Sequence, residues 1–265
     1  MERRLRGFGA DVRRYELDEA TADAVAGADR AVAAGGDGTI GPVAAAAARA
    51  AIPLAVVPVG TANDLARRLR IPLALDDACR LAVDGERTVP LDVARAGDRP
   101  FVNVASAGLA VHAAREAGRL KATLGAAAYA VGAARAALRG RPVRCQAAPA
   151  NSSSPSHAAR QVIVANSGAF GAGATVEVAD PADRRLDAAV LPARGRIHLV
   201  RYAWALRAGS IAAQADVSHG SGAAVTVDVP PGTRFNVDGE VVALGATAFT
   251  LDPARAEIVV PRSFA

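Results

Sequence analysis

Two short apolar runs near the start of the chain each stop at a glycine and give way to a segment suited to a helix. The runs cover residues 30–34 and 54–57, and helices are expected over 44–51, with Pro42 at its start, over 63–69 and over 76–85. Alternation of buried strands with helices is typical of a parallel sheet. The first part of the chain is therefore predicted to be an α/β domain, over residues 1–92.

The alternation of expected strands and helices ends after residue 86. A hairpin is expected between residues 87–95 and 101–105, followed by a long helix over 120–138 and an amphipathic helix over 195–208. Further short strands are expected over residues 143–147, 161–165, 175–178, 186–191, 224–229, 234–237 and 257–260. Residues 93–265 are thus predicted to form a mostly antiparallel β-sandwich domain with helices. A cleft between two such halves is a common ligand site.

Composition narrows the classes of partner. The 265 residues carry a formal charge of +5, but Lys121 is the only lysine, and no basic block is interleaved with aromatic residues. We therefore expect no nucleic-acid surface, although a modest positive charge favours approach to anionic lipid.

Cellular location is also constrained by the sequence. Cys79 and Cys145 are far apart and without ligand spacing, as expected of reduced, packed residues. No secretory signal follows the basic N-terminus, and the longest weakly polar run, residues 122–134, is too short to span a bilayer. A cytoplasmic protein with at most peripheral membrane contact is expected, and a homodimer remains open.

The glycine loops after the two apolar runs have the chemistry of a phosphate site. Backbone N–H groups at a turn and at a helix N-terminus bind anions, and the carboxyl ends of adjacent parallel strands meet at one sheet edge. Asp37 adds a carboxylate suited to a cation that accompanies phosphate. Ordinary βα turns remain the alternative, because glycine and aspartate are common turn residues.

Two better-known nucleotide motifs fit poorly. No glycine loop carries the lysine of a P-loop. The spacing of Gly36, Gly38 and Gly41 matches a dinucleotide fingerprint, but Asp37 inside the turn would repel a pyrophosphate. No acidic residue follows at the distance needed to hold a ribose.

Acidic turns later in the chain supply candidates for a base and a metal ligand. Asp238 and Glu240 flank a glycine between two expected strands, where a carboxylate could act as general base. The loop from Asp180 to Asp187 is rich in oxygen and could hold Mg²⁺. Both segments can equally be solvated turns. The four histidines show no zinc spacing: His112, His157, His198 and His219.

Taken together, these segments resemble the bacterial diacylglycerol kinase family, whose catalytic domain is shared with sphingosine and ceramide kinases. Residues 35–39 (Gly-Gly-Asp-Gly-Thr) and 57–67 (Val-Pro-Val-Gly-Thr-Ala-Asn-Asp-Leu-Ala-Arg) are similar to its two nucleotide-loop motifs. Residues 101–108, 164–167, 183–187 and 238–240 follow in the family's order. The likeness extends over about residues 8 to 262.

The resemblance implies an ATP-dependent lipid kinase, peripheral to the inner face of the cell membrane, that phosphorylates diacylglycerol or a related long-chain alcohol. Glu240 would take the proton from the lipid hydroxyl, with Asp238 beside it. Across the gap between the two halves, Glu240 would face the ATP–Mg²⁺ unit near Asp37. A structural Mg²⁺ would lie at Asp183, with main-chain carbonyls near Pro181, Arg184 and Leu186. The nucleotide would be bound by Gly35, Gly36, Asp37, Gly38, Thr39, Ile40, Gly41, Pro42, Gly60, Thr61, Asn63 and Asp64.

Three departures from the family pattern keep alternatives open. Gly41-Pro42 replace two polar residues, Arg184 stands where the family has glycine, and the family's first strand, which ends in an Asn-Pro loop, has no counterpart before Arg30. A catalytically impaired lipid- or nucleotide-binding homologue is one alternative. NAD kinase, which shares Gly-Gly-Asp-Gly-Thr, is another, although residues 60–67 argue against it.

Overall fold

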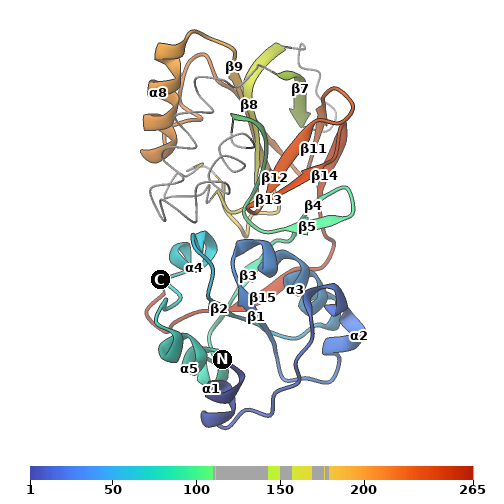
Figure 1. Ribbon diagram of the computed structural model, residues 1–265, viewed down its shortest axis with the longest axis vertical. Helices are drawn as coiled ribbons and strands as arrows, with labels where there is room; N and C mark the ends of the chain where they lie inside the picture. Colours follow the sequence, from blue (N-terminus) through green and yellow to red (C-terminus); the bar gives the residue numbers. More distant parts are fainter. Residues whose placement is uncertain (110, 112–142, 150–156, 169–175, 177–178, 265) are drawn as a thin grey trace, which may run out of the picture. The chain divides into compact units, whose positions relative to one another are not determined.

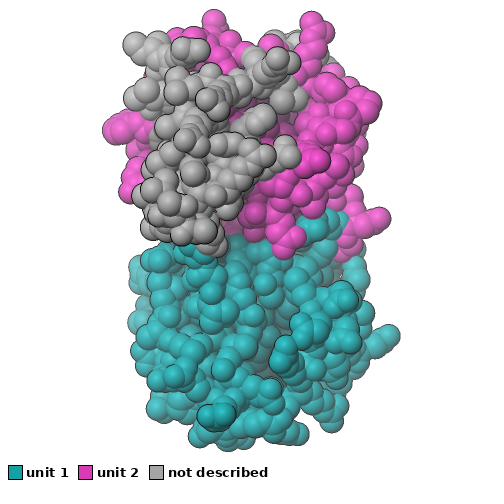
Figure 2. Space-filling model, viewed as in Figure 1, with its two compact units in different colours: residues 1–94, 99–102, 252–265 teal, residues 95–98, 103–251 magenta. Residues whose placement is uncertain are grey.

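The structure is a computed structural model that describes residues 1–109, 111, 143–149, 157–168, 176 and 179–264. Two compact units divide the chain and are coloured separately in Figure 2. Unit 1 comprises residues 1–94, 99–102 and 252–265, and unit 2 comprises residues 95–98 and 103–251. The domain division expected at residue 92 stays a prediction.

Unit 1 is built on a mixed, mostly parallel sheet (Figure 1). Among the described residues it has four strands in the order β1-β2-β15-β3, with β1 at one edge. Strands β1 and β15 both run parallel to β2, whereas β3 is antiparallel to β15. The strands are β1 (Ala31–Gly35), β2 (Leu54–Pro58), β15 (Ala256–Val259) and β3 (Thr88–Leu91).

Strand β15 corrects one sequence-based expectation. Residues 257–260 were expected to belong with the antiparallel strands, but β15 lies inside the sheet of unit 1. Ile258 and Val259 are almost fully buried there, since helices cover both faces of the sheet. The local pattern predicts a strand correctly, but it does not say which sheet the strand joins.

Helices cover the sheet of unit 1 on both faces. On one face α3 (Asp37–Ala50) packs its alanine-rich side against the strands. On the other, Leu5 of α1 (Glu2–Gly7) and Cys79 of α5 (Leu75–Asp84) meet Val57. The remaining short helices are η1 (Leu17–Glu19), α2 (Ala22–Val25) and α4 (Asp64–Arg68).

Helix α3 begins earlier than the sequence pattern predicts. It starts at Asp37, so Pro42 lies inside the helix rather than at its first turn. Proline lacks the N–H that would donate to the carbonyl of Gly38, and the first turns therefore lose one helical hydrogen bond. Tight packing explains why Gly41 precedes the proline. A Cβ on Gly41 would lie 2.7 Å from the carbonyl oxygen of Pro100.

The second sheet is antiparallel and has eleven strands among the described residues (Figure 1). Most of its residues belong to unit 2, whereas residues 99–101 belong to unit 1. Nine follow the order β13-β12-β6-β8-β7-β11-β14-β4-β5, while β9 pairs with β8 and with β10. The polar strand β10 and strand β14 were not predicted, whereas β13 was expected only as the second strand of the hairpin that carries Asp238 and Glu240. The strands are β4 (Ala94–Ala96), β5 (Arg99–Phe101), β6 (Val104–Gly108), β7 (Val143–Pro149), β8 (His157–Ala165), β9 (Leu186–Pro192), β10 (Ser218–Gly222), β11 (Ala224–Asp228), β12 (Arg234–Val237), β13 (Glu240–Ala243) and β14 (Thr247–Leu251).

One face of this sheet carries a core closed by α8 (Arg196–Arg207), the amphipathic helix expected over residues 195–208. Tyr202 and Ala205 of α8 pack in one cluster with Ile163 and Leu191 from the strands. Both cysteines are unpaired and buried, as predicted. Burial raises the pKa of the Cys145 thiol to about 11, so this group stays protonated at neutral pH.

Some expectations fall outside the part of the chain that the structure describes: the helix over 120–138 with Lys121, and most of the strand over 175–178. No helix among the described residues combines the length and the apolar character needed to cross a membrane. The predicted fold class, a mostly parallel α/β sheet followed by an antiparallel β domain, is confirmed.

The end of α3 offers a test of backbone strain. Ala51 follows the helix in the left-handed region, with φ of 54°. A residue with a Cβ is disfavoured there, so we expect Ala51→Gly to raise the free energy of unfolding by about 1 kcal/mol. Ala50→Gly, one residue earlier and inside the helix, should lower it by about 1 kcal/mol. Urea denaturation measures both, and equal effects would contradict the assignment of strain to residue 51.

Candidate functional site

The two glycine loops of unit 1 meet at one edge of its sheet. Strands β1 and β2 are parallel, and their last residues, Gly35 and Pro58, are register partners. Beyond them the backbone N–H of Val59 donates to the carbonyl of Gly35 at 3.0 Å. The loop that leads into α3 therefore lies beside the loop that leads into α4, as predicted from the order of the apolar runs.

Glycine is required where the loops touch. A Cβ built on Gly60 would lie 2.4 Å from the Cα of Gly36, a distance that real Cβ atoms do not reach. A Cβ on Gly35 would lie 2.2 Å from the Thr39 hydroxyl oxygen. The glycines thus allow two backbones to pack against each other, which the sequence suggested only as access for an anion.

Asp37 joins the two loops. Its Oδ2 accepts the backbone N–H of Asp64 and its Oδ1 accepts that of Leu65, both at 3.1 Å. These donors belong to the first turn of α4, where N–H groups lack partners within the helix. A carboxylate at this position also opposes the positive end of the helix dipole. A cation beside Asp37 stays a prediction, because the observed role of this side chain is to cap α4.

Asn63 fixes the second loop internally. Its Oδ1 accepts the N–H of Gly60 and its Nδ2 donates to the Gly60 carbonyl, both at 3.0 Å. The residue adopts φ of 50°, a left-handed conformation that asparagine tolerates better than most residues. These contacts account for the pairing of Gly60 with Asn63 in the loop.

The N-terminus of α3 is the candidate anion-binding end of the site. Gly36 caps this 14-residue helix without a side-chain hydrogen bond, and the N–H of Thr39 donates to the Gly36 carbonyl at 3.0 Å. Such a terminus binds anions through its N–H groups and its dipole. Among the other predicted residues, Thr61 is exposed, whereas Ile40 is 1% exposed and can contribute backbone only.

The second predicted cluster lies in unit 2, at the turn between β12 and β13. Val237 and Glu240 are register partners, so Asp238 and Gly239 form a two-residue hairpin loop. Their φ angles are 46° and 95°, as a type I′ turn requires at both positions. Aspartate followed by glycine is the sequence that this turn favours, which explains the local Asp-Gly pair.

The two carboxylates of this turn have different environments. The Oδ1 of Asp238 accepts the backbone N–H groups of Asn103 and Val104, each at 3.0 Å. Glu240 is exposed at the start of β13. Asp238 therefore positions the turn that carries Glu240. That Glu240 faces Asp37 stays a prediction.

Asn103 extends this network into the sheet. Its carbonyl accepts the N–H of Asn166 at 2.8 Å, and its side-chain oxygen accepts the Ser167 hydroxyl at 2.6 Å. The sequence marked these residues only through the order of the family motifs. Their partners could not be predicted, since Asn103 and Ser167 are 64 positions apart.

The acidic loop before β9 is a sequence of tight turns. Asp180 Oδ1 accepts the N–H of Ala182, and Asp183 Oδ1 accepts that of Arg185, both at 2.9 Å. Arg184 adopts φ of 62°, the conformation that glycine would take most easily. The turn is thus kept although the family's glycine is replaced. Asp187 at its end contacts His219 Nε2 at 2.9 Å.

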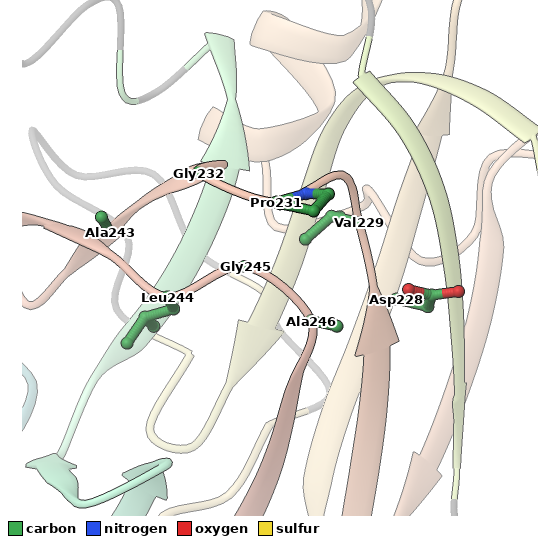
Figure 3. A pocket seen from close by; sticks show the side chains of 8 residues that line it. All are labelled: Asp228, Val229, Pro231, Gly232, Ala243, Leu244, Gly245 and Ala246. Carbon is green, nitrogen blue, oxygen red and sulfur yellow. The ribbon is translucent and has the colours of Figure 1, made fainter.

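No group of three or more His, Cys, Asp or Glu side chains in the described residues could hold a metal ion. A magnesium at Asp183 that is bound partly by main-chain carbonyls stays a prediction. One cavity of about 440 Å³ lies in unit 2, lined by residues 228, 229, 231, 232 and 243–246 (Figure 3). Asp228 supplies its only carboxylate and no predicted site residue lines it, so it offers little chemistry.

Two family models match the chain. The diacylglycerol kinase catalytic domain matches residues 8–96, and the YegS C-terminal NAD kinase beta sandwich-like domain matches residues 103–260. The second alone covers more than half of the chain.

Curated relatives match over a shorter stretch. A "Probable lipid kinase YegS-like" of Pectobacterium atrosepticum is 44% identical over 108 residues, which are 38% of this chain and 36% of that protein. Another of Yersinia enterocolitica is 42% identical over 127 residues, 45% of this chain and 40% of that protein. The match thus spans between a third and two fifths of these relatives' length.

Solved structures share the fold over nearly all of the chain. A diacylglycerol kinase from Bacillus anthracis aligns with a TM-score of 0.77 at 21% identity, covering 99% of this chain and 90% of that one. An NAD kinase from Archaeoglobus fulgidus in complex with ATP aligns with a TM-score of 0.52 at 12% identity, covering 98% and 88%. At these identities the likeness is one of fold.

Gly60→Ala tests the contact between the loops. The added methyl would meet the Gly36 backbone, so we expect a loss of about 1–3 kcal/mol in the free energy of unfolding. Urea denaturation measures the loss. Gly7→Ala, where a Cβ meets nothing within 4 Å, is the control and should be neutral or slightly stabilising. A Gly60→Ala variant as stable as the parent would show that the loops are not in contact.

Variants at Asp238 test the two buried N–H groups. Asp238→Ala leaves the N–H groups of Asn103 and Val104 without their acceptor, at a cost of about 2–3 kcal/mol in unfolding free energy. Asp238→Asn keeps an acceptor oxygen and a residue that tolerates the turn, so it should retain most of the stability. Thermal and urea unfolding compare the two, and equal losses would mean that the charge matters rather than the hydrogen bonds.

Proposed function

Because this chain belongs to the family of the diacylglycerol kinase catalytic domain and the YegS-like lipid kinases, we propose that it transfers the γ-phosphate of ATP to the hydroxyl of a lipid alcohol. The proposed acceptor is diacylglycerol or a related long-chain lipid. The protein would work as a peripheral protein at the inner face of the cell membrane, where such an acceptor is embedded.

One observation carries the nucleotide half of the proposal: two glycine loops in contact at the carboxyl ends of parallel strands, with the N-terminus of a long helix between them. The N–H groups of α3 have no side-chain cap, and Asp37 holds the neighbouring loop in place through α4. Phosphoryl transfer depends mainly on positioning and on neutralising charge. Backbone donors fixed in this way suit the phosphates of a nucleotide.

Glu240 is the proposed general base. It would accept the proton of the lipid hydroxyl as the hydroxyl oxygen forms a bond to the γ-phosphorus, while the bond from that phosphorus to the bridging oxygen breaks and ADP leaves. Exposure of Glu240 supports access by an external hydroxyl. The hydrogen bonds of Asp238 support a fixed position for the turn.

The metal that the family resemblance implies would lie at the acidic loop. Asp183 and main-chain carbonyls at Arg184 and Leu186 are oxygen donors of the kind Mg²⁺ prefers, and Asp183 is exposed on its turn. Bound Mg²⁺ would supply structural charge neutralisation in this loop. The Asp183–Arg185 hydrogen bond keeps the turn in shape.

Phosphate transfer to a lipid tests the proposal. Purified protein with γ-labelled ATP and diacylglycerol in mixed micelles should yield labelled phospholipid. We expect Glu240→Gln to lower kcat by 10²-fold or more, since it removes the proton acceptor and keeps the shape. Glu257→Gln, also an exposed glutamate on a strand, is the matched control and should leave the rate unchanged.

The same assay separates the alternatives. Transfer to NAD in place of lipid would identify an NAD kinase. Nucleotide or lipid binding without transfer to either acceptor would identify an impaired homologue. Full activity of a folded Glu240→Gln variant would overturn the role of that residue but leave the kinase assignment standing.

A further inference from the structure

The most exposed large hydrophobic side chain in the described residues is Trp204, on α8 of unit 2. Its relative exposure is 68%, whereas Tyr202 and Ala205 of the same helix are buried in the core. Figure 1 shows α8 lying along one side of its unit. A single exposed apolar side chain is ordinary on a protein surface, so the inference depends on the charges around this ring.

The charged residues of helix α8 are all basic. Residues 196–207 contain three arginines and no carboxylate, and the described ones, Arg201 and Arg207, are exposed on either side of Trp204 in the sequence. Residues at i−3 and i+3 neighbour Trp204 on the helix surface. An exposed indole with basic residues around it therefore projects from this face.

A polar cluster holds the helix in this orientation. Asp216 accepts the hydroxyl of Tyr202 at 2.6 Å and forms an ion pair with Arg201. Burial and the bond to Asp216 raise the pKa of Tyr202 to about 12, so the hydroxyl remains a donor at neutral pH. Because Tyr202 is tied on the inner side, Trp204 is kept on the outer side.

We propose that this face of α8 is a membrane-docking surface that binds an anionic lipid bilayer, with Trp204 inserted at the headgroup level and Arg207 over the lipid phosphates. Tryptophan favours the boundary between headgroups and acyl chains, and each arginine near an anionic surface adds attraction. The formal charge of +5 has the sign that fits such a surface and opposes a second copy of the same face. The inference rests on the proposed lipid substrate, which is reached from a bilayer.

The chain contains one tryptophan, so its fluorescence reports Trp204 alone. We expect the emission of the full-length protein to shift to shorter wavelength with vesicles of phosphatidylglycerol and phosphatidylcholine, and less with phosphatidylcholine alone. Raising the salt concentration should weaken the shift, because screening reduces the attraction.

Sedimentation with the same vesicles tests the side chains. Trp204→Ala should lower the partition coefficient on the order of tenfold through lost apolar contact. Arg207→Glu should lower it about 30-fold, since it reverses one charge at the surface. Tyr15→Ala and Arg262→Glu are the matched controls, an exposed aromatic and an exposed arginine of unit 1, and should bind as the parent does.

Several results would overturn the docking surface. One is sedimentation of the protein with vesicles while its tryptophan emission does not shift. Others are an unchanged partition coefficient for Trp204→Ala and Arg207→Glu, or no binding of the parent protein to anionic vesicles. A further one is an emission shift that depends on protein concentration alone. The last would assign the face to a second copy of the chain.

The proposed kinase function is tested separately from the docking surface. A short-chain diacylglycerol dissolved as monomers needs no bilayer, so Trp204→Ala should phosphorylate it at the parent rate and lose activity only on vesicles. Binding to vesicles by a protein inactive on both substrates would reject the kinase and keep the docking surface.

Discussion

The carboxylate of Asp37 is the contact on which the paired glycine loops of unit 1 depend. This side chain belongs to the first residue of α3 and accepts two N–H groups from the first turn of α4. It thereby joins two separate strand–loop–helix segments at one edge of the sheet. The close approach of the loops leaves no room for a Cβ on Gly60, and a Cβ on Gly36 would lie 3.3 Å from the Gly60 Cα. The loop geometry on which the proposed anion site rests is thus fixed before any ligand arrives, which would reduce the ordering cost of binding.

The sequence predicted the positions of the loops well, because each follows an apolar run that only a buried strand explains. It assigned Asp37 to a cation, whereas the structure gives both oxygens backbone partners. The start of α3 was missed, since Pro42 favours a first turn and glycines disfavour helix, yet burial of Ile40 and packing on the sheet override both preferences. Local preference is weak where tertiary contact is strong.

The acidic pair of unit 2 shows what pattern alone leaves out. Asp238 and Glu240 are equivalent candidates in the sequence, but the hairpin register makes one of them a cap for distant N–H groups and leaves the other exposed. That difference depends on partners more than 130 positions away. Strand β10 was missed for a related reason: Ser-His-Gly-Ser-Gly has no strand pattern, and its pairing with β9 supplies the order.

Strand β15 has a consequence for how the protein is made. It lies between β2 and β3, so the sheet of the first unit includes a segment synthesised long after both of its neighbours. Strands β2 and β3 therefore stay incompletely paired until that segment has left the ribosome. Contacts of such long sequence separation slow folding and leave strand edges exposed to aggregation meanwhile. Nascent chains of this protein are therefore expected to expose the unpaired edges of β2 and β3 until β15 is synthesised.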